Sequence, residues 1–328
     1  MKIAIVSDDR PGHFNQSFGV SKIISENRNA STAIIESKLK INPLRSVIRL
    51  YQRSLVKNFN VKNAKKIIDL YEIKFTSDYD LIISSGGDVA YLSASLSKVF
   101  GIKNIHVGSV KYIDLKYFDL HITLEKYEDS PNNLVTELSP TKYTPINNEV
   151  KKNKILFLIG GDGAGYSYSI DDWKLFIKNI IKLKEEYNIT PIIVTSRRTN
   201  PVHEKYIFNH TIDIADNLSL WQHKKEKPKH GLDCLFNKVD GIYVTEDSGM
   251  MTTEAISSGM PVCTIYPKSS RPNARFDRQL KKYESMKLII RQPFNSNFKR
   301  FSNNLNSSDR VIEIKEKLKN NIYKYLSI

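Results

Sequence analysis

Short apolar runs alternate with longer amphipathic segments along most of the chain. The apolar runs are rich in β-branched and aromatic residues and end in small or polar residues, a pattern typical of buried strands. They cover residues 3–7, 32–36, 79–84, 104–108, 119–124, 154–159, 191–195, 241–245 and 261–266. Helices are predicted at residues 15–24, 44–57, 61–71, 88–100, 171–187, 248–258, 274–283 and 308–325. This alternation predicts an α/β fold with parallel sheets covered by helices.

The alternation is interrupted near the middle of the chain. Residues 139–153 are polar, lack periodicity and contain Pro140 and Pro145, which is typical of a linker. We therefore expect two Rossmann-like domains, residues 1–145 and 146–328, whose parallel sheets face a central cleft. The pattern leaves open that the final helix packs back on the first domain, and it assigns no structure to residues 213–229.

The composition adds limits on the class of protein. Of the 328 residues, 40% are hydrophobic, but the longest apolar stretches, such as residues 155–159, are far too short to cross a bilayer. The first residues turn acidic at Asp8, so we expect no signal peptide. Cys234 and Cys263 lack the spacing of metal ligands, which predicts reduced thiols in a cytoplasmic protein.

The formal net charge of +15 predicts an anionic partner: a phosphorylated substrate, an anionic lipid or nucleic acid. Residues 37–68 contain no acidic side chain, and Arg45, Arg49, Arg53 and Lys57 recur at every fourth position. This basic stripe, with an apolar face on the same helix, fits a protein that lies peripherally on the inner, anionic face of a membrane. It fits equally well a helix packed on the core with a solvated basic side. No motif supports nucleic-acid binding.

The most informative candidate site is the turn after the strand at residues 241–245. Glu246 follows that strand, and either Asp247 or Ser248 can cap the next helix. The free amides and the dipole of a helix N-terminus favour an anion, and Glu254 lies about two turns into this helix. Phosphate on the amides and sugar hydroxyls on the two glutamates would suit a nucleotide sugar. An ordinary capped surface helix is the alternative.

Two further turns are candidates for the same ligand. Gly161 follows the strand at residues 154–159 and permits close approach of the backbone. Ser196, Arg197 and Arg198 follow the next strand, and an arginine there can hold a diphosphate through paired hydrogen bonds. A solvated, charged turn is the alternative interpretation.

The loop after the first strand carries the candidates for acid–base chemistry. His13 is a candidate general base because imidazole exchanges a proton near neutral pH. Asp8 and Asp9 are candidates to orient His13, and Asp9 is the alternative base. His13 could instead only satisfy backbone groups at the start of a helix.

The same end of the first sheet offers residues for an acceptor substrate. Gly12 permits a tight turn, and Asn15 and Gln16 can bind a hydroxyl-rich acceptor or cap the helix. Gly87, in a glycine pair after another strand, permits close approach of a ligand.

Taken together, these motifs resemble the mitochondrial-fission ELM family. The matching segments are residues 9–16 (DRPGHFNQ), 196–199 (SRRT) and 244–248 (VTEDS), followed by Met251, Glu254, Ala255, Gly259, Pro261 and Val262. The family includes bacterial glycosyltransferases assigned to lipooligosaccharide core assembly. The resemblance implies a GT-B fold with an acceptor site in the first domain and a nucleotide-sugar site in the second. It also implies a metal-independent reaction without a cofactor.

The resemblance therefore implies transfer of a sugar from a nucleotide sugar to a lipid-linked or oligosaccharide acceptor. By the same resemblance Glu254 would contact the donor ribose, and His13 would be placed like the base of inverting enzymes. The spacing of Glu246 and Glu254 is similar to a motif of retaining enzymes, so the stereochemical outcome stays open. A nucleotide-sugar epimerase or hydrolase and a non-enzymatic membrane-recruitment protein are the alternatives.

Overall fold

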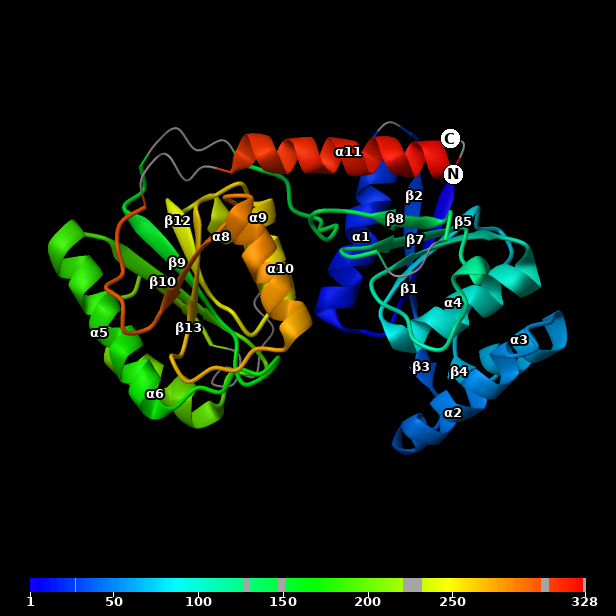
Figure 1. The fold of residues 1–328 in the computed structure, drawn as a ribbon, viewed down its shortest axis with the longest axis horizontal. Helices are drawn as coiled ribbons and strands as arrows, with labels where there is room; N and C mark the ends of the chain where they lie inside the picture. Colours follow the sequence, from blue (N-terminus) through cyan, green and yellow to red (C-terminus); the bar gives the residue numbers. More distant parts are fainter. Residues whose placement is uncertain (27, 127–129, 147–150, 221–231, 302–306, 327–328) are drawn as a thin grey trace. The chain divides into compact units, whose positions relative to one another are not determined.

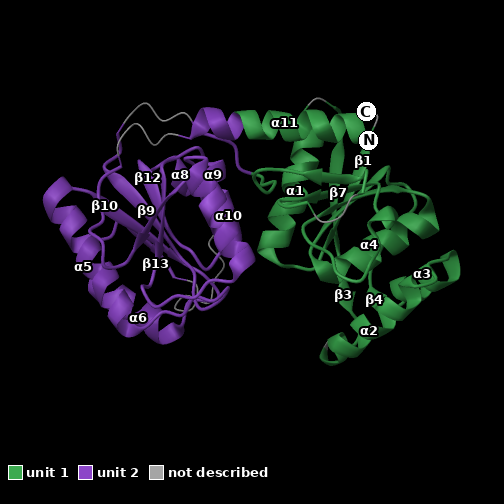
Figure 2. Cartoon of the chain, in the orientation of Figure 1, with its two compact units in different colours: residues 1–142, 313–328 green, residues 143–312 purple. Residues whose placement is uncertain are grey.

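A computed structural model describes the chain except for residues 27, 127–129, 147–150, 221–231, 302–306 and 327–328. The chain divides into two compact units (Figure 2). Unit 1 comprises residues 1–142 and 313–328, and unit 2 comprises residues 143–312. Of the helices in the described parts, none is long and apolar enough to span a membrane.

Unit 1 is built on a six-stranded parallel sheet with the strand order β2-β1-β5-β6-β7-β8 (Figure 1). The strands of this sheet are β1 (Lys2–Ser7), β2 (Ser31–Glu36), β5 (Leu81–Ser85), β6 (Lys103–Val107), β7 (Leu120–Thr123) and β8 (Asn133–Val135). A small antiparallel pair joins β3 (Lys38–Leu39) to β4 (Tyr71–Glu72). The helices are α1 (Pro11–Ser25), α2 (Arg45–Val56), α3 (Val61–Ile68), α4 (Gly87–Phe100) and most of α11 (Ser308–Leu326), with single 3-10 turns at Asn42–Leu44 and Leu115–Tyr117.

Both faces of this sheet are buried, as alternating side chains of a parallel strand require. On one face Ile3 and Ile5 of β1 pack with residues of α1 and with Leu318 and Ile322 of α11. On the other face Ile82 of β5 packs with residues of α3 and α4. The near-continuous apolar runs in the sequence reflect this burial on two sides.

Unit 2 repeats the architecture with the strand order β11-β10-β9-β12-β13-β14, again all parallel. Its strands are β9 (Lys154–Ile159), β10 (Thr190–Thr195), β11 (Asn217–Ser219), β12 (Gly241–Thr245), β13 (Val262–Tyr266) and β14 (Ile290–Pro293). Its helices are α5 (Ile170–Tyr187), α6 (Pro201–Thr211), α8 (Asp233–Phe236), α9 (Gly249–Ser257), α10 (Ala274–Ser285) and the start of α11. The predicted fold class, two Rossmann-like units with parallel sheets, is thus confirmed.

Two helix starts differ from the sequence prediction. Helix α1 begins at Pro11 and not near Asn15, because proline is well suited to the first position of a helix, where its missing N–H is not needed. His13 therefore lies in a helical turn and not in a loop. Helix α5 is capped by Ser169 and not by Asp171: Ser169 accepts from the N–H of Asp172, and the Asp172 side chain accepts from the N–H of Ser169.

Several short elements were not predicted. Strands β8, β11 and β14 lie at the edges of the sheets and have only three or four residues each, too few to show a period. Helix α6 follows the Ser196–Thr199 turn, where Asn200 caps it through its side chain. Of residues 213–229, which the sequence left unassigned, residues 221–229 lie outside the described part of the chain.

Each sheet has a topological switch point, a pair of neighbouring strands from which the chain continues to opposite edges of the sheet. In unit 1 it lies between β1 and β5, because the chain proceeds from β1 to β2 and from β5 to β6. In unit 2 it lies between β9 and β12. Ligands of open α/β sheets bind outside the carboxyl ends of the strands at such points. The loops after these four strands are therefore where a site is expected.

Candidate active site

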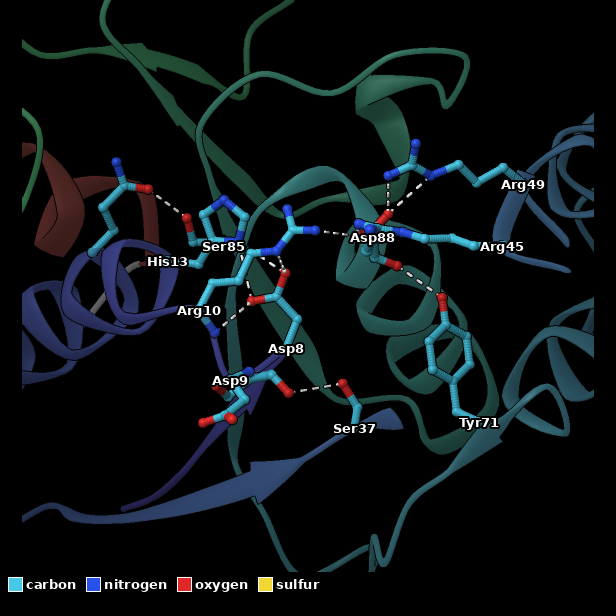
Figure 3. A network of polar contacts seen from close by, with 12 residues as sticks. Asp8, Asp9, Arg10, His13, Ser37, Arg45, Arg49, Tyr71, Ser85 and Asp88 are labelled. Carbon is cyan, nitrogen blue, oxygen red and sulfur yellow. Dashed lines mark hydrogen bonds and ion pairs between the residues drawn. The ribbon is translucent and has the colours of Figure 1, made fainter. Parts of the chain in front are cut away.

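The first candidate site lies where β1 ends in unit 1. Nδ1 of His13 is 2.9 Å from Oδ2 and 3.1 Å from Oδ1 of Asp8 (Figure 3). The backbone N–H of Arg10 donates to the same carboxylate over 3.3 Å. Because Asp8 lies just before α1 and His13 lies in its first turn, the helix start brings the two side chains together. This is the arrangement of a general base held by a carboxylate.

Asp8 is ionised in this arrangement. Burial disfavours its charged form, but the hydrogen bond from His13 and the charges of His13 and Arg10 outweigh burial and lower the pKa of Asp8. An ionised carboxylate fixes the proton of His13 on Nδ1 and leaves Nε2 as the basic nitrogen. The His13 side chain is 29% exposed, which keeps the imidazole accessible to a substrate.

The neighbouring strand β5 supplies the residues that pack on this pair. Gly86, directly before α4, has φ +96°, and a Cβ at this position would overlap the imidazole of His13. The hydroxyl of Ser85 donates to Oε1 of Gln16, whose Nε2 donates to Ser139 over 3.4 Å. The pair thus sits at the switch point of unit 1, between β1 and β5.

The predicted acceptor residues gather around this pair. Gly12, Asn15 and Gln16 lie in the first two turns of α1, and Gly87 is the first residue of α4. A Cβ at Gly87 would meet no described atom within 4 Å, so the backbone there is open to approach. These four residues come from the starts of two helices, α1 and α4, which follow the neighbouring parallel strands β1 and β5.

Asp9, predicted as an alternative base, lies apart from His13. Its φ is +58°, and this turn in the backbone directs its exposed side chain away from the imidazole (Figure 3). Its backbone N–H donates to Oγ of Ser7 over 3.2 Å. The geometry therefore favours Asp8 and not Asp9 as the carboxylate that acts with His13.

A residue that the sequence did not reveal is Asp88, in the first turn of α4. Its carboxylate, 12% exposed, pairs with Arg10, Arg45 and Arg49 (Figure 3). Nε of Arg49 is 2.9 Å from Oδ1, and Nη2 of Arg10 is 3.5 Å from Oδ2. The only sequence signals were an aspartate after a glycine pair and two arginines one turn apart. Neither signal indicates a contact across forty residues.

These contacts change the interpretation of the basic stripe on α2. Arg45 and Arg49 are directed at Asp88, and the guanidinium of Arg53 lies over the ring of Tyr112 at 3.7 Å from its centroid. Lys57, at the end of the helix, is exposed. The three arginines therefore contact other residues of unit 1, while Arg45 and Arg49 remain 33% and 44% exposed.

The apolar residues of α2 also divide. Ile48 and Leu55 are buried in the core of unit 1, whereas Leu44, Val47 and Tyr51 are exposed, as is Leu50. The helix therefore has one face packed on the protein and a second apolar face on the surface.

The second candidate site lies at the switch point of unit 2 and centres on Asp247. Its buried carboxylate accepts from the backbone N–H of Gly161 over 3.0 Å and from the hydroxyl of Tyr168 over 3.0 Å. Nη2 of Arg198 donates to it over 2.5 Å. Burial raises the pKa of Asp247, while Arg198 and the hydrogen bonds oppose this shift. Asp247 therefore joins the loops after β9, β10 and β12.

This junction fixes Arg198 beside the start of α9. Both terminal nitrogens of Arg198 lie 3.4 Å from the carbonyl oxygen of Asp247, two residues before the helix begins. Ser248 caps α9, accepting from the N–H of Met251 over 3.4 Å. The first turn of α9, Gly249 to Thr252, is uncharged, so its amides and Arg198 together favour an anion.

The turn at residues 196–199 is fastened to the end of β9. Thr199 donates to the carbonyl oxygen of Gly160 over 2.5 Å, and Oγ of Ser196 accepts from the N–H of Arg198 over 3.2 Å. Arg197 is exposed on the same turn. The structure thus places Gly161, Ser196, Arg197, Arg198, Asp247 and Ser248 at one edge of the sheet, in the loops after β9, β10 and β12.

Glu246 differs from the expectation of a sugar contact, because it is fully buried. Oε1 accepts from Nε of Arg291 and from the hydroxyl of Thr264, both over 2.7 Å. Oε2 accepts from Nη2 of Arg291 over 2.9 Å and from the hydroxyl of Tyr166 over 2.7 Å. Four donors occupy this carboxylate, and its hydrogen bond raises the pKa of Arg291. These contacts give Glu246 a structural role in the turn before α9.

Glu254 lies in the second turn of α9 and is 6% exposed. Its charge acts on the hydroxyl of Tyr143, whose pKa is raised by burial, by Glu254 and by Asp233. Glu246 and Glu254 are therefore in different surroundings, and they do not act as a matched pair of ligands. In the described parts of the chain, no group of three or more His, Cys, Asp or Glu residues is arranged to hold a metal ion.

Comparison with known proteins agrees with this architecture. The family model described as mitochondrial fission ELM1 matches residues 11–318. The chain belongs to this ELM1 family. The match extends from the first turn of α1, which carries His13, into α11. No curated protein matches the sequence of this ELM1 family member.

Solved structures show the fold that this family member shares. The glycosyltransferase SnogD from Streptomyces nogalater has a TM-score of 0.52 at 10% identity, covering 97% of this chain and 95% of that one. MnaA from S. aureus, determined with UDP, has a TM-score of 0.50 at 15% identity, covering 99% and 97%. A protein from Listeria monocytogenes described as a UDP-N-acetylglucosamine 2-epimerase has a TM-score of 0.50 at 10% identity, covering 97% and 89%. The fold is therefore GT-B-like.

Proposed function

We propose that the protein is a glycosyltransferase that moves a sugar from a nucleotide sugar to a glycan or glycolipid acceptor in cell-envelope synthesis, of the lipooligosaccharide type. The observation that carries this proposal is Arg198, held by buried Asp247 beside the first turn of α9 at the switch point of unit 2. A guanidinium fixed next to a helix N-terminus is suited to a diphosphate. The resemblance of the fold to a glycosyltransferase and to a protein determined with UDP supports this choice.

In this proposal the two units have different roles. Nε2 of His13 takes the proton of the acceptor hydroxyl, and ionised Asp8 stabilises the imidazolium that forms. In unit 2, Arg198 and the amides of α9 stabilise the negative charge on the departing nucleoside diphosphate. Gly161 lets the backbone of Arg198 pack against it and so keeps the Arg198 turn beside the donor. Glu254 is the ribose ligand of the donor. Neither role requires a metal, so we expect turnover to survive an excess of EDTA.

The donor site can be tested by calorimetric titration of UDP, GDP, ADP and CMP into the full chain. We expect one of them to bind and Arg198→Gln to weaken that binding about 10- to 150-fold, since a charged hydrogen bond is worth about 1.5–3 kcal/mol. Arg197→Gln removes an equal charge from an exposed side chain on the same turn and should have a smaller effect. Lys182→Gln, on the surface of α5, is the charge-matched control. Absence of binding by all four nucleotides would refute the donor site.

Transfer itself is tested by incubating the protein with the nucleotide sugar that binds and a panel of glycolipid acceptors. A labelled sugar appearing in the glycolipid supports the proposal. Glu254→Ala should weaken donor binding while leaving the fold intact. Unchanged binding by this variant would remove Glu254 from the donor site.

An epimerase or a hydrolase on the same fold is the second candidate, favoured by the similarity to the Listeria protein described as an epimerase. Incubation of the protein with UDP-N-acetylglucosamine in the absence of an acceptor separates the activities. An epimerised nucleotide sugar or a free sugar, followed by NMR, would indicate this chemistry. A transferase leaves the donor almost unchanged under these conditions.

Membrane association is a further part of the proposal and rests on α2. Leu44, Val47, Leu50 and Tyr51 form its exposed apolar face, and exposed Lys57 ends the helix. This face, with a net charge of +15 on the chain, is suited to an anionic membrane surface that carries a glycolipid acceptor. Pelleting with vesicles that contain anionic lipid should fall on the double substitution Val47→Glu/Leu50→Glu. Equal pelleting with neutral vesicles would contradict the attraction of the positively charged chain to an anionic membrane.

A non-enzymatic recruitment protein remains the alternative from another class. It predicts that His13→Ala and Arg198→Gln leave cellular function intact, whereas loss of the apolar face of α2 abolishes it. The transferase predicts the reverse sensitivity for His13 and Arg198.

A further inference from the structure

Three guanidinium groups in unit 1 converge on one carboxylate. Arg10 comes from the loop after β1, and Arg45 and Arg49 come from adjacent turns of α2. All three pair with Asp88 at the start of α4 (Figure 3). Asp88 itself is held from behind, because its backbone carbonyl accepts from the hydroxyl of Tyr71 over 2.8 Å. The backbone of Asp88 is therefore anchored, and the three arginines are arranged around its carboxylate.

The group has more positive charge than its carboxylates neutralise. Arg10 also lies 3.6 Å from Asp8, so three guanidinium groups share the two carboxylates of Asp8 and Asp88. This leaves one surplus positive charge, and a protonated His13 would add another. Burial and the charges of Arg10 and Arg49 lower the pKa of Arg45, which shows that these cations repel each other. Each guanidinium has five N–H donors, far more than two carboxylates can accept.

The surplus donors are not sealed inside the protein. The side chains of Arg10, Arg45 and Arg49 are 39%, 33% and 44% exposed, whereas Asp88 is 12% exposed. The backbone at Gly87 is open, since an added Cβ would meet no described atom within 4 Å. An incoming group therefore meets arginine donors and the first amides of α4 before it meets the carboxylate.

We propose that Arg10, Arg45 and Arg49 form a binding site for an anionic group of the acceptor, a phosphate or a carboxylate, beside the His13–Asp8 pair. This inference rests on the proposed transferase function and makes it more specific: the acceptor is an acidic glycan or glycolipid. Arg10 contacts both Asp8 and Asp88, so it links the anion site to the base. The bound anion then positions a neighbouring hydroxyl of the acceptor at Nε2 of His13.

The test uses three sugars as probes: glucose 1-phosphate, glucuronate and neutral glucose. Each is titrated into the full chain carrying Arg198→Gln, which removes the other predicted anion site. We expect saturable binding of at least one acidic sugar and much weaker binding of glucose. Preference for the phosphate or for the carboxylate identifies which acidic group the acceptor carries.

The deciding variant is Arg45→Gln/Arg49→Gln, with Arg49→Gln alone as a milder change at the most exposed of the three arginines. Lys62→Gln/Lys66→Gln is the matched control, because it removes two charges at the same four-residue spacing from exposed positions of α3. We expect the arginine variants to weaken acidic-sugar binding more than tenfold and the lysine variant to leave it unchanged.

Binding of the acidic sugars that is unaffected by the arginine variants, or absent from the parent chain, would overturn the inference and leave the arginines as an anchor of α2. Nucleoside diphosphate binding is measured in parallel on chains that retain Arg198. Its persistence in the arginine variants shows that unit 2 is folded, and urea denaturation followed by circular dichroism shows whether unit 1 is folded as well. Its absence from every chain refutes the proposed transferase without affecting the test of the anion site.

Discussion

Nδ1 of His13 lies 2.9 Å from Oδ2 of Asp8, and the two residues are separated by only four others in the sequence. The contact exists because Pro11 starts α1 early enough to place His13 in its first turn. A carboxylate so close to Nδ1 settles which ring nitrogen is basic, provided that Asp8 is ionised.

The first prediction distinguishes the two neighbouring aspartates. Asp8→Asn removes the charge that orients His13 and stabilises its protonated form, so we expect kcat for transfer to fall about 10²- to 10⁴-fold, as for His13→Ala. Asp9→Asn changes an exposed side chain directed away from the imidazole and should lower kcat far less. Steady-state kinetics, with circular dichroism as the folding control, measures both effects. The opposite order would make Asp9 the base.

A second prediction concerns the two glycines before and within α4. Gly86→Ala places a methyl group against the imidazole of His13 at φ +96° and should destabilise unit 1 by about 1–3 kcal/mol while reducing transfer. Gly87→Ala places the same methyl group in open space, so its free energy of unfolding should change by about 0.5 kcal/mol or less. Urea denaturation followed by circular dichroism measures both. Equal destabilisation by the two substitutions would contradict the packing of Gly86 on His13.

The third prediction tests the buried pair of Glu246 and Arg291. In Glu246→Gln the amide nitrogen faces guanidinium donors and cannot accept from them, so unit 2 should lose about 3–5 kcal/mol of stability. Glu186→Gln, which breaks the exposed pair with Lys182 on α5, should cost about 0.5 kcal/mol or less. Trp173 is buried in the core of unit 2, so its fluorescence during urea unfolding reports this unit.

If Glu246 contacts sugar instead of supporting the turn, Glu246→Gln would weaken donor binding without changing this unfolding curve.

The fourth prediction is a pH dependence of stability from Asp8. Because the pKa of Asp8 is lower in the folded chain than the ordinary value of 3.8, its ionised form stabilises unit 1 above that value. This contribution is lost as the pH falls below about 4 and through the lowered pKa. Asp8→Asn should therefore show a shallower loss of stability between about pH 4 and pH 2 than the parent chain. NMR titration of the side-chain carboxyl carbon measures the pKa directly; a value at or above 3.8 would contradict the proposed contact.

The sequence predicted the longer elements because buried parallel strands are continuous apolar runs and long helices show a clear period. Examples of such strands are β1, β9, β10, β12 and β13. The end of α9 was also predictable, because Gly259, with φ +77°, follows the helix. The short edge strands lacked such a signal. Their pairing depends on hydrogen bonds to a neighbouring strand, which no local pattern encodes.

The site residues also fall into two groups, those that the sequence pattern identified and those that only the fold revealed. The turn containing Ser248 and the segment containing His13 were predictable as candidate sites, since both follow strands and lie at the starts of helices. The roles of Glu246 and Asp88 were not predictable. The sequence does not distinguish a carboxylate that is paired with a buried arginine from one that is accessible to a ligand. Arg45 and Arg49 form a regular stripe in the sequence, but only the fold directs them at Asp88.

Helix α11 has a consequence for how the protein is made. Leu318, Ile322 and Leu326 complete the core of unit 1 against α1, and Lys319 pairs with Glu26 over 3.4 Å. These residues leave the ribosome only after all of unit 2. The core of unit 1 is therefore completed last, and unit 2 can fold before it. A fragment of residues 1–142 would expose the apolar surface that α11 covers, and it should aggregate unless residues 313–328 are supplied as a separate peptide.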